Sequence, residues 1–182
     1  MKKLSKSFYI SAIGVGFIPG IFVFALGAAE SEERSEIGPP LLLLGVVLLL
    51  CVMVVMLTFW YKAWQSIQDG FARATPSMAI GYLFIPVYSF YWLFQCIWGF
   101  ARDYNKYLVR HSLNARKLPE GLFLAFCLLE VVPFSAVLIL VPMMGSSGEV
   151  WVGGGWIVGE LAGFVLGFVL VAKTCDAVNA LA

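Results

Sequence analysis

The sequence predicts an all-α integral membrane protein. We expect four transmembrane helices, a re-entrant or interfacial helical hairpin between the second and third, and an amphipathic helix on the cytoplasmic surface after the hairpin. Of the 182 residues, 61% are hydrophobic and only 13% are charged, and the mean hydropathy is +0.90. Soluble domains are about 45–50% apolar and about 25% charged. The length of the apolar runs and the placement of the positive charges complete the argument. Residues 1–182 are expected to form a single membrane domain.

The apolar residues form five runs, at about residues 8–29, 39–61, 78–100, 121–144 and 150–172. Each approaches the roughly 20 residues that a helix needs to cross a hydrocarbon core about 30 Å thick. Five crossings from a cytoplasmic N-terminus would translocate seven of the twelve Lys and Arg residues. If the middle run returns to the side it entered from, eleven of the twelve stay cytoplasmic and only Arg34 is outside. Because Lys and Arg in short loops resist translocation, we predict four spans with both termini cytoplasmic.

The first run admits two interpretations. Lys2, Lys3 and Lys6 precede it, and Ala25-Leu26-Gly27 near its end resembles a small-residue cleavage site. The apolar part of a signal peptide is about 7–15 residues long, whereas this run has about 22. A retained span is therefore preferred, and cleavage stays open.

The middle run, 78–100, is interrupted near its centre by Pro86. Proline removes a backbone donor and disfavours helix at the preceding residue, Ile85. Two half-helices entering and leaving the inner leaflet are expected, packed against the spans, because non-helical backbone at membrane depth must be covered. A kinked fifth span is the alternative.

Residues 101–118 are predicted to form a surface helix. Arg102, Lys106 and Arg110 recur every four residues, with Lys117 near the same face. Such a basic face fits the anionic inner leaflet, where each cation contributes about 1 kcal/mol near the surface. A solvated cytoplasmic helix is the alternative.

The segment before and within the hairpin contains a distinctive motif. Trp60 and Trp64, four residues apart, are expected to anchor the second span at the membrane interface. Thr75 before Pro76 is typical of a helix N-cap followed by proline at the first helical position. A structural role is expected for these residues, and recognition of a lipid or a cytoplasmic protein is the alternative.

Residues 60–107 resemble a group of uncharacterised bacterial multi-pass membrane proteins. Their shared core reads Trp…Arg-x-(Ser/Thr)-Pro…Ala-(Val/Ile)-Gly-x-x-Phe-Ile-Pro. It is matched here by Trp60, Arg73, Thr75, Pro76, Ala79, Ile80, Gly81, Phe84, Ile85 and Pro86. The resemblance implies a bacterial cytoplasmic (inner) membrane protein and implies no activity.

Glycines recur every four residues along the last predicted span, at Gly155, Gly159, Gly163 and Gly167. A ridge of small residues lets another helix backbone approach closely. The partner is either the first span, where Ala12, Gly16 and Gly20 have the same spacing, or a second copy of the chain in a homo-oligomer.

Glu130 and Glu160 are the only ionisable residues deep in the four predicted spans. Each lies about ten residues, some 15 Å, from the start of its span, near the bilayer midplane. A charge at this depth costs at least about 2.5–3.5 kcal/mol, so both side chains should face protein or water. They either form a proton or cation path or hydrogen-bond as neutral carboxyls.

The sequence contains no recognisable catalytic, cofactor-binding or metal-binding motif, and no basic module for nucleic acid. We therefore expect no enzymatic activity, no cofactor and no metal site. The expected function is that of a small membrane module that scaffolds or senses through its cytoplasmic hairpin and basic helix, with the lipid bilayer, a cytoplasmic or membrane protein, or a second copy of the chain as partner. A proton or cation conduit using Glu130 and Glu160 is the alternative.

Overall fold

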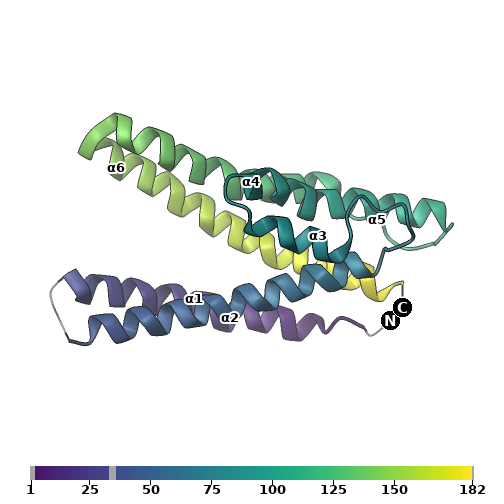
Figure 1. The fold of residues 1–182 in the computed structure, drawn as a ribbon, viewed down its shortest axis with the longest axis horizontal. Helices are drawn as coiled ribbons and strands as arrows, with labels where there is room; N and C mark the ends of the chain where they lie inside the picture. Colours follow the sequence, from purple (N-terminus) through teal and green to yellow (C-terminus); the bar gives the residue numbers. More distant parts are fainter. Residues whose placement is uncertain (1–2, 33–35, 182) are drawn as a thin grey trace.

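The computed structural model describes the backbone of residues 3–32 and 36–181, and the side chains of the same ranges except 31–32 and 133–160. Over these residues the chain is helical, without strands, as the sequence predicts (Figure 1). The elements in chain order are α1 (Lys6–Glu32), α2 (Gly38–Gln65), α3 (Pro76–Gly81), η1 (Tyr82–Phe84), α4 (Tyr88–Leu93), η2 (Phe94–Trp98), α5 (Gly99–Arg110) and α6 (Glu120–Asn179).

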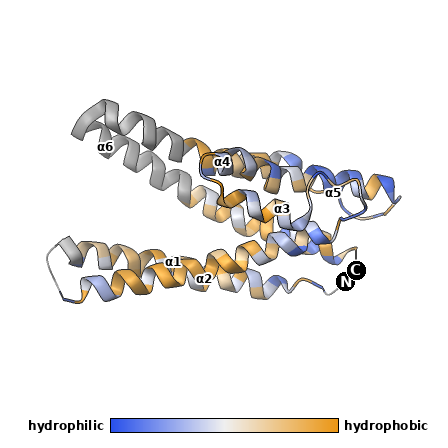
Figure 2. Ribbon diagram, in the orientation of Figure 1, coloured by the Kyte–Doolittle hydropathy of each residue, from blue (hydrophilic) through white to orange (hydrophobic). Residues whose placement is uncertain are grey.

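Three segments whose side chains are described are long and apolar enough to cross a membrane. They are Lys6–Glu30, Gly38–Gln65 and Leu161–Asn179, with mean hydropathies of 2.1, 3.1 and 1.8. Hydrophobic residues cover α1 and α2 along most of their length (Figure 2). Large apolar side chains such as Val15 and Leu43 point outward. Exposed apolar surface of this extent is typical of helices in contact with lipid, so these three helices are compatible with a membrane protein.

Helices α1 and α2 form a tight antiparallel hairpin because glycines on both helices allow their backbones to approach. A Cβ added to Gly45 would lie 2.6 Å from the backbone of Phe24, and one added to Gly27 would meet the backbone of Leu42. Further along α1, Gly16 faces the side chain of Val52 on α2. The alternative in which Gly16 and Gly20 pair with the last span is therefore wrong, since both face α2.

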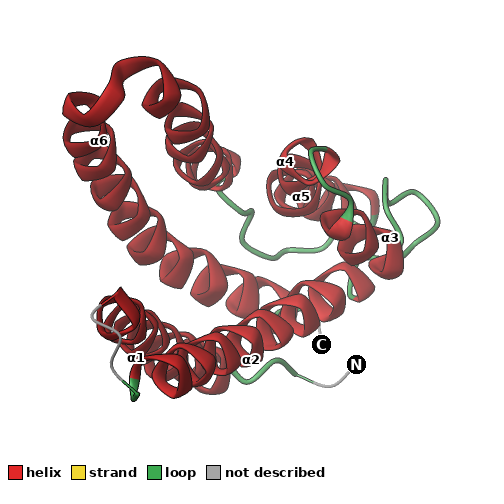
Figure 3. Ribbon diagram, turned by 60° about the vertical axis from the view of Figure 1, so that its left-hand side comes forward, coloured by secondary structure: helices red, strands yellow, loops and turns green. Residues whose placement is uncertain are grey.

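Helix α6 turns back on itself. Its 60 residues would extend about 90 Å if straight, and residues 130 and 163 would stand about 50 Å apart. Instead, the Glu130 carboxyl touches Gly163, so the two arms lie side by side (Figure 3). The separate apolar runs at 121–144 and 150–172 predict two helices. The backbone between these runs is helical, and the side chains there lie outside those described.

The second arm of α6 also packs on α1. Phe17 and Phe164 stack with ring centroids 5.0 Å apart, and Phe168 lies 3.7 Å from the Cβ position of Gly14. The last arm therefore contacts α1, one of the two partners expected for it, but it does so through phenylalanine rings.

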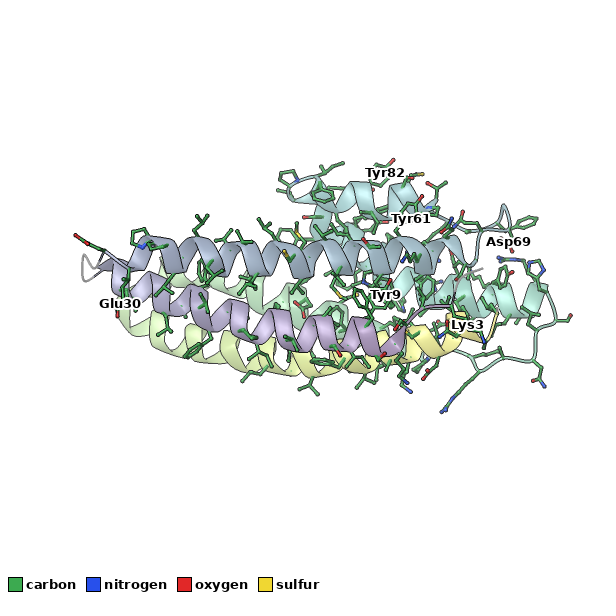
Figure 4. The ribbon with its side chains drawn as sticks, turned by 90° about the horizontal axis from the view of Figure 1, so that it is seen from below. Lys3, Tyr9, Glu30, Tyr61, Asp69 and Tyr82 are labelled. Carbon is green, nitrogen blue, oxygen red and sulfur yellow. The ribbon has the colours of Figure 1, made fainter. Side chains whose placement is uncertain are left out.

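The two ends of the chain meet at one end of the bundle (Figure 1). The Leu4 N–H donates to Asn179 Oδ1 at 2.7 Å, and Asn179 Nδ2 donates back to the Leu4 carbonyl at 2.9 Å. An ion pair joins Lys6 to Asp176 at 2.8 Å. Lys3 and Asp69 lie at this end and Glu30 at the other (Figure 4).

Candidate functional site

Between α2 and α6 the chain forms a short helical hairpin at the end of the bundle that holds the termini. Thr75 caps its first helix, since its Oγ1 accepts the Met78 N–H at 3.3 Å, and Pro76 takes the first helical position. This confirms the predicted cap. The returning helix runs alongside, because Trp92 Nε1 donates to the Ala79 carbonyl at 3.0 Å.

The tip of the hairpin is a strained turn next to the predicted break at Pro86. The Tyr88 N–H donates to the Pro86 carbonyl at 2.7 Å, closing a three-residue turn around Val87, whose φ is 65° and ψ −49°. These angles are those of the uncommon γ-turn with positive φ, which is costly for a β-branched residue. Val87 is 81% exposed, and Phe84 and Ile85 beside it are exposed too. The tip is thus apolar and free of cover within the described part of the chain.

A π-helical segment, η2, fastens the returning helix to α2. Within this segment the Cys96 carbonyl accepts a hydrogen bond from Trp64 Nε1 at 3.0 Å. Trp64 and Trp60 are both buried, edge-on to Phe100 with centroids 5.7 and 5.8 Å away. Their rings pack between helices, which is the structural role expected of them. Anchoring of the second span at the membrane interface stays a prediction.

An ion pair closes the base of the hairpin. Asp103 on α5 accepts from Arg73 Nη2 at 3.0 Å, from Arg73 Nε at 3.1 Å and from the Arg73 backbone N–H at 2.9 Å. The remaining arm of the guanidinium donates to Gln95 Oε1 at 2.9 Å. The Asp103 side chain is 6% exposed and that of Arg73 27%. Residues 73 and 103 therefore meet, so the segment between them begins and ends at one place.

The sequence motif includes Arg73, but Asp103 was not predicted as its partner. The position of Asp103 could have indicated the ion pair, because it falls on the apolar face of α5 between Phe100 and Tyr104, which are both fully buried. An acidic residue at such a position needs a cation as its partner, because an unpaired buried charge is costly.

The predicted surface helix over 101–118 is shorter than expected, because α5 ends at Arg110. Ser112 adopts a left-handed φ of 51°, and the Leu113 N–H returns to the Leu108 carbonyl at 2.9 Å. Together with the bond from the Ser112 N–H to the Val109 carbonyl, this is a Schellman motif. Lys117 consequently lies off the helix, so the predicted four-cation face is wrong in this part.

The other three cations of α5 have different surroundings. Arg102 stacks over the Trp98 ring at 4.8 Å, and Lys106 is exposed. Arg110 binds Asp69 at 2.7 Å. Burial alone would raise the pKa of Asp69, but hydrogen bonds from the Phe71 N–H, Arg110 and His111, together with the Arg110 charge, hold that pKa below its ordinary value.

The segment between α5 and α6 is hydrogen-bonded to α5 through the side-chain amide of Asn105. Asn105 Nδ2 donates to the Leu118 carbonyl at 2.9 Å, and its Oδ1 accepts the Leu118 N–H at 2.8 Å. This pairing places the segment before α6 against the end of the bundle. There a pocket of about 430 Å³ is lined by Arg116, Lys117, Leu118, Pro119, Lys173, Asp176, Ala177 and Ala180. Three cations face one carboxylate, and that carboxylate already pairs with Lys6.

A second, larger cavity of about 510 Å³, partly open to the surroundings, lies between α1, α2, the returning arm of the hairpin and both arms of α6. Its lining is apolar apart from Glu130. Glu130 Oε1 lies 2.6 Å from where a Cβ of Gly163 would stand, and the Cβ position of Gly167 is 3.5 Å from Phe126. Both glycines therefore face the first arm of α6. The surroundings of Gly155, Gly159 and Glu160 lie outside the described part of the chain.

No family model, no curated protein and no solved structure matches this chain. The resemblance of residues 60–107 to uncharacterised bacterial multi-pass proteins stays a prediction.

Proposed function

We propose that the chain is a four-span module of the bacterial cytoplasmic membrane that senses or scaffolds at its cytoplasmic face through recognition of anionic lipid. The four spans in this proposal are α1, α2 and the two arms of α6. The hydrogen bonds between Leu4 and Asn179 support an even number of crossings, because they hold both ends of the chain together.

The proposal makes the hairpin re-entrant. The ion pair between Arg73 and Asp103 supports this, since a segment whose ends are joined does not cross a bilayer. No charged residue occurs between these two positions except Arg102, next to the base. The exposed apolar tip at Val87 suits immersion in lipid.

Labelling single cysteines from each side of the membrane tests this topology. Lys106→Cys, with the native cysteines replaced, is expected to react with a membrane-impermeant maleimide from the side that carries the C-terminus, and Glu30→Cys from the opposite side. Val87→Cys should resist the reagent from both sides, because lipid surrounds the tip. Reaction of Lys106→Cys from the side of Glu30 would contradict the four-span arrangement.

The basic pocket carries the functional proposal. Arg116, Lys117 and Lys173 converge there from two chain segments at the end of the bundle that holds the termini. Cations beside an anionic leaflet attract phosphate headgroups, and convergent cations give a defined site instead of a diffuse charge. Anionic lipid bound here would contact both the chain before α6 and its last turns, which is how the module could report lipid composition to a partner.

We expect the purified protein to retain phosphatidylglycerol in preference to phosphatidylcholine, as measured by native mass spectrometry. Lys173→Gln should weaken that preference about fivefold, because one cation near a membrane surface contributes about 1 kcal/mol. Lys106→Gln is the matched control: it removes the same charge from the same face outside the pocket and should change retention less than twofold. Equal losses for both variants would show a diffuse basic surface and reject the pocket.

A conduit for protons or cations is the second candidate. Glu130 supports it by reaching the wall of a cavity inside the bundle. The described lining offers no second ionisable group, so the lipid-sensing proposal is preferred. Gly163 and Gly167 face the first arm of α6, so these two glycines are not open to a second copy of the chain. Assembly of copies through the rest of the glycine ridge stays a prediction.

A further inference from the structure

The central cavity carries a separate inference. We propose that it is a binding site for one lipophilic alcohol, a molecule with an apolar body and a single hydroxyl group, whose hydroxyl hydrogen-bonds to Glu130. The occupant would reach it from the hydrocarbon core. This site is independent of the basic pocket at the end of the bundle.

Size and lining support a site for a small molecule. A volume of about 510 Å³ is within the range of ligand pockets, about 300–1,000 Å³. Aliphatic and aromatic side chains from five elements form its walls, among them Phe17, Val52, Met56, Ile97 and Leu170. Apolar walls with one placed polar group are typical of ligand pockets, in which the polar group sets the orientation.

Gly163 provides the room in which the carboxyl lies. Its missing side chain lets Glu130 Oε1 occupy a place 2.6 Å from the Cβ position, where any other residue would displace it. Gly167, one turn further along the same arm, allows only an ordinary contact with Phe126 at 3.5 Å. The two glycines therefore line one cavity but differ in what they hold in place.

A hydroxyl group is the polar group that these observations favour. It can donate to a carboxylate and can both donate to and accept from a protonated carboxyl, so it binds Glu130 in either state. A cation entering through the hydrocarbon core would first lose its hydration, at a cost of at least about 2.5–3.5 kcal/mol. An alcohol enters at a much smaller cost.

Photolabelling in phosphatidylcholine nanodiscs tests the site. The probe is hexadecanol carrying a diazirine near the middle of its chain, and the competitors are hexadecanol, hexadecane and hexadecylamine, dosed per mole of lipid. Labelling of residues around the cavity is expected to saturate. Hexadecanol should compete roughly threefold to tenfold better than hexadecane, which is the range for one net hydrogen bond.

Variants separate the hydroxyl contact from general packing. Glu130→Leu should abolish the advantage of hexadecanol over hexadecane, and Glu130→Gln should retain it to within about twofold. Gly163→Ala should reduce the advantage because the new methyl displaces the carboxyl, whereas Gly167→Ala should preserve it. The alanine pair keeps the test valid if Glu130→Leu fails to fold.

Two results would overturn the proposal. Labelling that rises linearly with probe and is not competed would show a space filled by bulk acyl chains. Stronger competition by hexadecylamine, lost in Glu130→Gln, would show a site for lipophilic cations. Loss of phosphatidylglycerol retention in Lys173→Gln would leave all of these outcomes unchanged, so the two sites are tested separately.

Discussion

Asp103→Asn is expected to destabilise the protein by about 3–5 kcal/mol and to release the hairpin from α2. Breaking one partner of a buried ion pair leaves the other charge without compensation. Here the partner is the Arg73 guanidinium, which gives three of its hydrogen bonds to Asp103 through Nε and Nη2. Asparagine keeps the size of the side chain but loses the charge and one acceptor oxygen, so the change removes the ion pair and part of its hydrogen bonding with little effect on packing.

Two measurements test the expected effect of Asp103→Asn. Unfolding in detergent micelles reports the lost free energy, and alkylation of the native Cys96 thiol, followed by peptide mass spectrometry, reports the hairpin. Cys96 is 1% exposed beneath the Trp64 contact, so it should react slowly in the parent protein and quickly in the variant. A Cys96 that stays protected in Asp103→Asn would contradict the view that the ion pair holds the hairpin.

The control is the ion pair between Lys6 and Asp176 at the end of the bundle. Its side chains are 43% and 63% exposed, and exposed pairs contribute about 0–1 kcal/mol. Asp176→Asn should therefore change the unfolding free energy by no more than about 1 kcal/mol and leave Cys96 protected. The contrast separates burial from the mere presence of opposite charges.

The second large effect is expected at the contact between α1 and α2. Gly45→Ala would place a methyl carbon 2.6 Å from the N and Cα atoms of Phe24. A backbone cannot rotate away as a side chain end can, so the two helices must separate. Overpacking of this kind costs about 1–3 kcal/mol, and we expect a value in the upper part of that range.

Gly121→Ala is the matched control for this variant. It is also a helical glycine, but its Cβ position has no neighbouring atom within 4 Å. Alanine gains about 0.5–1 kcal/mol over glycine within a helix, so this variant should be neutral or slightly stabilising. The measurement is the midpoint of thermal unfolding for both variants in one detergent. Equal midpoints would mean that the close approach of α1 and α2 adds no stability.

Local features of this chain follow from its sequence because their causes lie within a few residues. The excess of apolar residues predicted helices in a membrane. Pro86 predicted the break in the hairpin, because proline limits its own backbone and that of its neighbour. Thr75 predicted the helix start, because a cap bonds two or three residues ahead.

The end of α5 shows where this reasoning stops. The spacing of Arg102, Lys106 and Arg110 is helical, and nothing adjacent to Arg110 forbids another turn. The helix ends because Ser112 turns the backbone and Asn105 pairs with the distant Leu118. The pairing of Asn105 with Leu118 joins residues that are 13 positions apart, so local helix propensity does not predict it.

The sequence by itself determined the helical class, the long apolar helices and, through Pro86, the position of the break in the hairpin, since each of these causes acts within one segment. The tertiary structure alone decided which partners meet. Regularly spaced glycines indicate that another helix can pack closely against them. They do not indicate that Gly163 faces Glu130 or that Gly45 faces Phe24. Likewise, the pairing of Arg73 with Asp103 depends on how α5 returns to the end of α2. Contacts between distant residues depend on how all the helices pack together, and the periodicity of a single sequence does not predict that packing.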